Sequence, residues 1–121
     1  MFGIFKRSFE IIFSDPLAGE LEVALIESYQ HLKDTGHSAQ ANCLKGILKS
    51  VIDRDSELFK KRVITTDLLG GSGSVLDVWV EPEQTREQFE KSFNKFLNLT
   101  LQAGLTHRAV KQAERASKIK L

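Results

Sequence analysis

The residues best suited to a chemical role lie in one short stretch rich in glycine and serine. Residues 70–74 read Gly-Gly-Ser-Gly-Ser, and a run that favours extended backbone, 75–80, follows at once. Consecutive amides in such a loop can converge on an anion. A phosphate loop of the nucleotide-binding type ends in Gly-Lys-Ser or Gly-Lys-Thr and opens a helix, however, and no lysine follows here. The glycines therefore predict a tight path with positive φ or a close backbone approach, and anion binding is the lesser alternative.

Asp77 is the one carboxylate in this stretch, and its neighbours are apolar. Burying a carboxylate is costly unless hydrogen-bond donors meet it. Asp77 can point into solvent, or it can accept hydrogen bonds from residues 71–74 and fix the loop; a catalytic acid is the less favoured role. The candidate binding loop consists of Gly70, Gly71, Ser72, Gly73, Ser74, Asp77 and Trp79.

A catalytic or metal-binding set is not evident in the sequence. The three histidines, at positions 31, 37 and 107, fall on different predicted elements without the spacing of metal ligands, and Cys43 is the one cysteine. No histidine lies near the loop serines, although a catalytic triad can assemble from distant residues. We expect no catalytic residue, no metal ion and no cofactor. A small enzyme that uses the Gly70–Asp77 loop stays as an alternative.

Length and composition predict a single globular domain spanning residues 1–121. Hydrophobic residues make up 41% and charged residues 27% of the chain, and the formal net charge is +1. This balance gives no overall field that would hold a polyanion, so nucleic acid is not the expected partner. One cysteine cannot form an internal disulfide, which is typical of the reducing cytoplasm, and we expect a cytoplasmic protein.

The chain starts with apolar side chains at intervals of three and four, which predict an amphipathic helix over residues 2–13. They are Phe2, Phe5, Phe9, Ile12 and Phe13. We expect this segment to dock on the body of the domain; a peripheral membrane or partner-binding segment is the alternative. Lys6 and Arg7 interrupt the apolar run, and no run reaches the ~20 apolar residues of a membrane span, so export and membrane insertion are not expected.

Helical periodicity dominates the remaining chain. Amphipathic patterns cover residues 17–34, 38–52, a shorter piece up to about 62, the stretch after Pro82 and residues 105–119. They predict a compact, mainly α domain of four to five helices.

Two other stretches, 63–66 and 75–80, favour extended backbone because the first is β-branched throughout and the second alternates. A lone strand leaves its backbone donors and acceptors unsatisfied, so it needs a partner strand in this chain or another. We therefore expect one short strand or a β-hairpin around residues 63–80.

Two segments carry unbalanced charge. Residues 15–34 hold five acidic residues against Lys33, a net charge of −4. The candidate contacts on this acidic face are Glu20, Glu27 and Asp34. Residues 106–121 form a predicted basic C-terminal helix, with five lysines and arginines against Glu114, a net charge of +4. Both faces are more typical of solvated surface than of binding sites. A nucleic-acid-binding accessory protein that uses the basic helix is the second alternative.

The loop and its surroundings resemble a family of small, functionally uncharacterised bacterial proteins that carry a Gly-Gly-x-Gly-Ser-x-x-Asp block after helical segments. The block is matched by Gly70, Gly71, Gly73, Ser74 and Asp77. The resemblance covers residues 17–103 and leaves the Phe-rich start and the basic extension outside it. Such proteins are similar, by analogy, to immunity and accessory proteins. The block brings no known activity with it. Because no catalytic constellation is evident, and by this analogy, we expect a non-catalytic protein that binds another protein, with a bacterial toxin as a candidate partner; a homo-oligomer stays open.

Overall fold

The computed structural model describes residues 11–120, with side chains described as far as residue 116. In this part of the chain it has helices and no strand. The helices are α1 (Asp15–Asp34), α2 (Ser38–Ile52), α3 (Ser56–Val63), α4 (Thr66–Leu69), α5 (Glu83–Gln102) and α6 (Arg108–Lys120). The prediction of a mainly α fold is confirmed, and the described helices outnumber the four to five that were expected.

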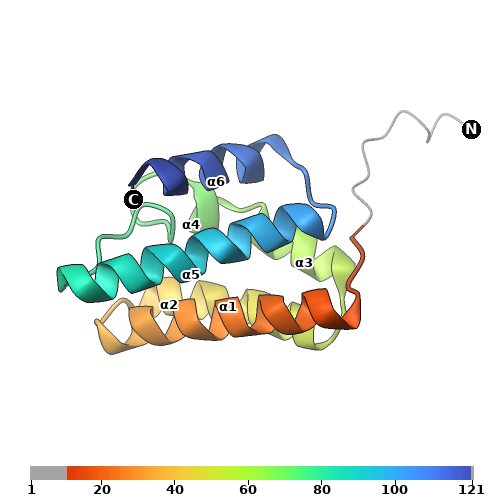
Figure 1. The fold of residues 1–121 in the computed structure, drawn as a ribbon, viewed down its shortest axis with the longest axis horizontal. Helices are drawn as coiled ribbons and strands as arrows, with labels where there is room; N and C mark the ends of the chain where they lie inside the picture. Colours follow the sequence, from red (N-terminus) through yellow and green to blue (C-terminus); the bar gives the residue numbers. More distant parts are fainter. Residues whose placement is uncertain (1–10, 121) are drawn as a thin grey trace, which may run out of the picture.

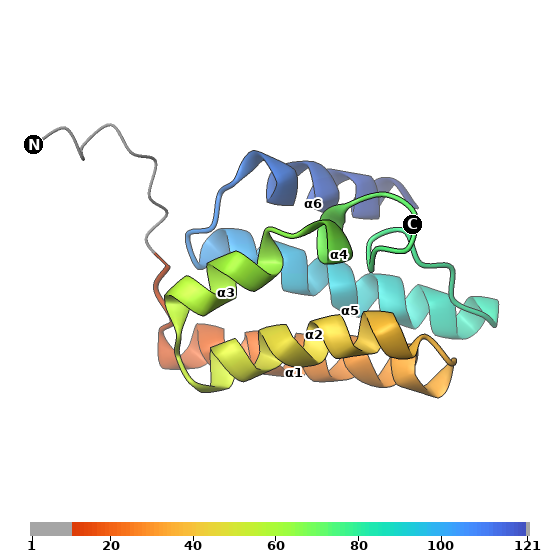
Figure 2. The same cartoon turned by 180° about the vertical axis from the view of Figure 1, so that it is seen from behind.

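The helices stack in layers (Figure 1). α1 and α2 run in opposite directions in the lowest layer of the view, α5 lies on α1, and α6 covers α5 and α4 at the top. The rear view in Figure 2 shows α3 and α4 above α2. The irregular segment 70–82 lies at the end of the molecule where α5 begins and where α1 turns into α2.

Local signals in the sequence set the helix ends. The Ser14 hydroxyl accepts the Leu17 amide at 3.4 Å at the start of α1, and Pro16 occupies its first turn. Gly36, with φ of 83°, allows the turn that separates α1 from α2. The Asp55 carboxylate accepts the Leu58 amide at 3.1 Å and begins α3. The start of α1, the turn between α1 and α2 and the start of α3 all lie where the sequence pattern predicts them.

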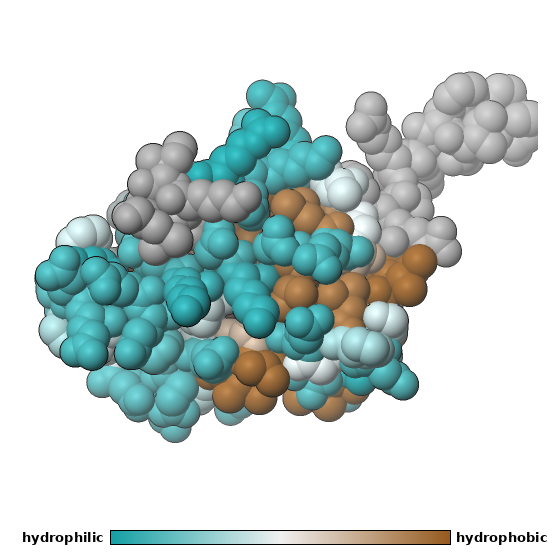
Figure 3. All heavy atoms as spheres, viewed as in Figure 1, coloured by the Kyte–Doolittle hydropathy of each residue, from teal (hydrophilic) through white to brown (hydrophobic). Residues whose placement is uncertain are grey.

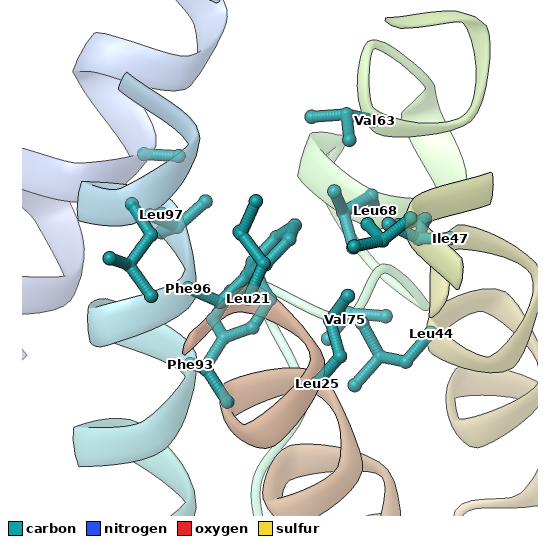
Figure 4. Packing of buried hydrophobic residues seen from close by; sticks show 14 of the residues in the cluster. Leu21, Leu25, Leu44, Ile47, Val63, Leu68, Val75, Phe93, Phe96 and Leu97 are labelled. Carbon is teal, nitrogen blue, oxygen red and sulfur yellow. The ribbon is translucent and has the colours of Figure 1, made fainter. Parts of the chain in front are cut away.

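One apolar cluster joins the described helices. Figure 4 shows side chains from α1, α2, α4 and α5 pointing toward a common centre, which Val75 of the irregular segment also reaches. The labelled residues are Leu21, Leu25, Leu44, Ile47, Val63, Leu68, Val75, Phe93, Phe96 and Leu97. Full burial of each large apolar side chain contributes about 1.5–3 kcal/mol to folding, so the segment 70–82 is held by the core and not only by its own turns.

The expected strand or hairpin around residues 63–80 is wrong. Val63 ends α3 with a fully buried side chain, and Thr65 caps α4, because its hydroxyl accepts the Leu68 amide at 3.2 Å. The amides of Val75 and Leu76 donate to the carbonyls of Asp67 and Leu68, both at 3.0 Å. Two backbone amides of the expected strand are thus satisfied by carbonyls of the short helix α4.

Most of the predicted N-terminal helix, residues 2–10, lies outside the described residues. Residues 11–13 are described and are not helical. These three residues contact the domain: the Ile12 amide donates to the Ala103 carbonyl at 2.9 Å, and the Phe13 ring meets the Phe59 ring edge-on at 5.2 Å. Among the described residues, no helix combines the length and apolar character that a membrane crossing requires.

Candidate functional site

Two glycines of the candidate loop are required by the structure, each for a different reason. A Cβ at Gly70 would lie 2.5 Å from the Thr66 carbonyl oxygen, so only glycine fits where the chain leaves α4. Gly73 has φ of 88°, a conformation that other residues adopt only with strain. Gly71 has open space around it. The prediction of a close backbone approach and of positive φ is confirmed, each at one glycine.

Ser74 holds the loop together from inside. Its side chain is buried, and its hydroxyl donates to the Gly70 carbonyl and accepts the Asp77 amide at 3.2 Å. Asp77 therefore contributes its backbone and not its carboxylate to the loop. That carboxylate is exposed, and no hydrogen bond or ion pair to it occurs among the described residues. Of the two structural roles expected for Asp77, the outward one is observed.

Trp79 stands on the surface of this segment with 62% of its side chain exposed. The guanidinium of Arg86, at the start of α5, lies 4.0 Å from the centre of its ring. The indole N–H donates to the Glu81 carboxylate at 2.9 Å. Arg86 also donates to the Val80 carbonyl at 3.2 Å and pairs with Glu81 at 3.6 Å. Trp79 is thus exposed yet held on two sides.

Buried anchors and one cross-link fix this segment to the body of the protein. The side chains of Val75 and Val80, on either side of Asp77 and Trp79, are fully buried. The Gln40 amide group, in the first turn of α2, donates to the Gly73 carbonyl at 3.0 Å. The exposed positions Ser72, Asp77 and Trp79 therefore project from a backbone with many restraints.

A hollow of about 520 Å³ adjoins the loop between α2, α3 and α4. Its lining residues are Ala39, Gln40, Asn42, Cys43, Gly46, Arg62, Thr65, Asp67 and Gly73. Ser72, Ser74 and Asp77 do not line it. Burial, and to a smaller extent the negative charge of Asp67, raises the pKa of the Cys43 thiol to about 11. The thiol is therefore protonated at neutral pH, which makes it a poor nucleophile.

The acidic face of α1 is exposed but is not part of the loop surface. Glu20, Glu27 and Asp34 all lie on the surface, and Asp34 accepts the Gln30 amide group at 2.8 Å. Glu27 borders a second hollow, of about 690 Å³, between α1 and α5. Its other lining residues are His31, Gln88, Lys91, Ser92, Asn94, Lys95 and Asn98. The lysines of α5 offset the negative charge on this side of α1.

The remaining titratable candidates stay apart. His31, on α1, borders the hollow between α1 and α5, and His37 precedes α2. His107 precedes α6, where its ring Nδ1 accepts the Ala109 amide at 3.0 Å. Residues 11–116 contain no group of three histidine, cysteine or acidic side chains that could hold a metal ion. On α6, Arg108, Lys111 and Arg115 are exposed, as a solvated basic face would be.

Arg86 is the site residue that the sequence pattern did not single out. The structure turns its side chain back toward Trp79 and Glu81. A contact across the turn at Pro82 has no periodic signature. The only signal for it was a Trp, a Glu and an Arg within eight residues of one another.

No protein-family model, curated protein or solved structure matches the chain. The resemblance that depends on the Gly-Gly-x-Gly-Ser-x-x-Asp block stays a prediction.

Proposed function

We propose that this protein works by binding another protein, without catalysis, and that Trp79 is the centre of the contact. The observation that carries the proposal is the exposed indole held between Arg86, 4.0 Å from its ring centre, and Glu81, 2.9 Å from its N–H. Leaving a large aromatic ring in water forgoes the free energy of burying it. A ring that is already ordered loses little side-chain entropy when a partner covers it, which is the property of a binding hot spot.

The surroundings of Trp79 suit a polar rim around an aromatic centre. Asp77, Glu81 and Ser72 are exposed in the same segment, while the buried side chains of Val75 and Val80 anchor its backbone. Interfaces of this kind place an aromatic anchor among polar residues that exclude water. The acidic residues Glu20, Glu27 and Asp34 form the second candidate contact, for a basic patch on a partner.

We further propose that the partner is a toxin and that this chain is a bacterial immunity protein. Two features support this narrower proposal. The Gly-Gly-x-Gly-Ser-x-x-Asp block resembles that of small bacterial proteins, and a fixed exposed surface suffices for stoichiometric neutralisation. The Cys43 thiol, which is protonated at neutral pH, offers no activated nucleophile beside the loop.

The test is quantitative affinity capture from the native host with three baits: wild type, Trp79→Ala and Ile12→Ala. Ile12 is the matched control, because it is 64% exposed against 62% for Trp79. Its backbone meets Ala103 at the C-terminal end of α5, whereas Trp79 meets Arg86 at the start of α5. Loss of a hot-spot tryptophan costs about 2 kcal/mol or more, which is about thirtyfold in affinity. We expect Trp79→Ala to lose a partner that wild type and Ile12→Ala retain.

Recovery of the wild-type chain alone, or equal capture by all three baits, would contradict the proposal. The narrower proposal has its own readout, which is growth of cells that express the captured partner. If the partner is a toxin, co-expression of wild type restores growth and co-expression of Trp79→Ala does not. A captured partner that leaves growth unaffected would refute the immunity role and leave the binding role standing.

A further inference from the structure

The outer face of the α1–α2 pair exposes large apolar side chains. Val23 and Ile26 on α1 are 56% and 48% exposed, and Ile52 at the end of α2 is 54% exposed. Among the described residues, the only other exposed large hydrophobic residues are Ile12 and Trp79. Figure 3 shows hydrophobic surface along the lower edge of the molecule, where α1 lies in the same view. Exposed apolar side chains that cluster in this way mark interaction surfaces.

Helix geometry places Val23 and Ile26 on one face of α1, and an ion pair places the end of α2, with Ile52, beside that helix. Val23 and Ile26 are three residues apart, on the side of α1 opposite its buried residues such as Leu25. The ion pair of Arg54 with Glu22, at 3.1 Å, holds the end of α2 beside the second turn of α1. Ile52 therefore lies near the level of Val23. The result is an apolar strip on the outer surface of the helix pair, with Val23 and Ile26 on α1 and Ile52 at a similar level on α2.

The two helices that flank this strip carry opposite charge. Residues 15–34 of α1 have a net charge of −4, whereas residues 38–52 of α2 contain two lysines and no acidic residue. Both lysines are exposed; Lys49 pairs with Asp53 at 3.1 Å, just past the end of α2, so Lys45 is the lysine of this helix without an ion pair among the described residues. A face with one acidic and one basic edge is complementary to a copy of itself, because a two-fold rotation about the seam between the two helices exchanges the edges.

We propose that a second copy of this chain covers the strip, with α1 of each copy lying on α2 of the other. A two-fold axis parallel to the seam produces this arrangement and sets acidic helices against basic ones. An axis across the seam would instead set α1 against α1, which charge repulsion disfavours. The contact is separate from Trp79, which Arg86 holds at the start of α5, so both surfaces are available at once.

The size of the face predicts a reversible dimer. A 20-residue and a 15-residue helix side by side expose a face about 20 Å wide and 22–30 Å long. That is at the lower end of specific interfaces, where dissociation constants on the order of 10 µM are common. The dimer should therefore form at high protein concentration and dissociate on dilution.

The test is sedimentation equilibrium of the full chain from about 5 to 200 µM, a range that brackets the expected constant. We expect wild type to move from monomer to dimer across this range. Ile26→Glu should stay monomeric, because it places a carboxylate in the strip, and circular dichroism should show that it is folded. The matched control Ile12→Glu introduces the same charge at a residue that is 64% exposed and whose backbone meets the end of α5, and it should dimerise like wild type.

Charge reversal supplies an independent arm. Lys45→Glu should weaken the dimer about tenfold at low salt and less at high salt, since salt screens exposed charges. A wild-type chain that stays monomeric at 200 µM would overturn the proposal. So would an Ile26→Glu variant that dimerises as tightly as wild type, because the contact would then lie elsewhere. Trp79→Ala should leave the dimer unchanged, so the dimer and the proposed partner contact at Trp79 can fail independently of each other.

Discussion

The guanidinium carbon of Arg86 lies 4.0 Å from the centre of the Trp79 ring, and the same guanidinium donates to the Val80 carbonyl at 3.2 Å. One side chain therefore positions both the exposed indole and the backbone that follows it. Only 15% of the Arg86 side chain is exposed, so this contact is screened less than a fully solvated one. The order of Trp79 depends on Arg86 more than on any regular secondary structure.

We predict that Arg86→Gln frees the indole. The variant removes the cation–π contact and weakens the bond to the Val80 carbonyl, which together should lower the free energy of unfolding by about 1–2 kcal/mol. Because the chain has one tryptophan, fluorescence anisotropy decay reports Trp79 alone. Faster local motion is expected in Arg86→Gln and not in Lys49→Gln, whose ion pair with Asp53 lies on the surface of α2. Equal motion in wild type and Arg86→Gln would show that other contacts hold the ring.

The buried hydroxyl of Ser74 should matter more to stability than any other polar group of the loop. Ser74→Ala leaves the Gly70 carbonyl and the Asp77 amide, which are partly buried, without this partner, and should lower the free energy of unfolding by about 1–2 kcal/mol. Ser72→Ala, at an exposed position in the same loop, should change the free energy of unfolding by less than about 0.5 kcal/mol. Urea unfolding measures both. Similar effects at the two serines would argue against a Ser74-centred loop.

The glycines should respond differently to alanine. Gly70→Ala forces a Cβ to within 2.5 Å of the Thr66 carbonyl oxygen, and relieving that clash should cost about 1–3 kcal/mol. Gly71→Ala meets no neighbour and should be neutral or stabilising by up to about 1 kcal/mol, because it restricts the unfolded chain. Thermal unfolding of the two variants distinguishes them. If Gly70→Ala were as stable as Gly71→Ala, the close approach to α4 would be refuted.

The Cys43 thiol predicts loss of stability at alkaline pH. Its pKa is raised from 9.0 to about 11 in the folded protein, first by burial and then by the charge of Asp67. The unfolded chain therefore releases this proton at lower pH than the folded one. Below about pH 8 the thiol is protonated in both the folded and the unfolded state, so it does not change the free energy of unfolding. As pH rises from 9 toward 11, it lowers that free energy progressively.

Melting temperatures of wild type and Cys43→Ala between pH 7 and pH 11 measure this effect. The wild type should lose more stability than Cys43→Ala over the upper part of that range, and iodoacetamide should modify the folded thiol at least about tenfold more slowly than the unfolded one at pH 8. Parallel pH curves, with equal thiol reactivity in both states, would contradict the raised pKa.

The long helices were predictable because their signals are local. Ser14 and Pro16 begin α1, Gly36 ends it, and the phenylalanines of α5 repeat at helical intervals. The structure of segment 63–80 was not predictable in this way. Its β-branched residues favour a strand, but carbonyls of α4 accept hydrogen bonds from the amides of Val75 and Leu76. Local propensity loses to such tertiary hydrogen bonds.

The candidate loop was located from its glycines, but its internal arrangement was not. Ser74 is buried and structural, which a pattern of alternating residues does not reveal. The contact between Arg86 and Trp79 requires the chain to reverse at Pro82, and the residues on either side of that turn share no helical or strand period. The sequence supplies the residue types of the loop, but which of them contact one another depends on the fold.

Fluorine NMR of the chain labelled with fluorotryptophan tests most directly our proposal that a protein partner covers Trp79. The label gives one resonance, because the chain has one tryptophan, and an unlabelled partner adds none. Titration with the partner recovered by affinity capture should shift or broaden this resonance and saturate at a stoichiometric ratio. A resonance that stays unchanged while the complex forms would place the contact elsewhere and contradict the account.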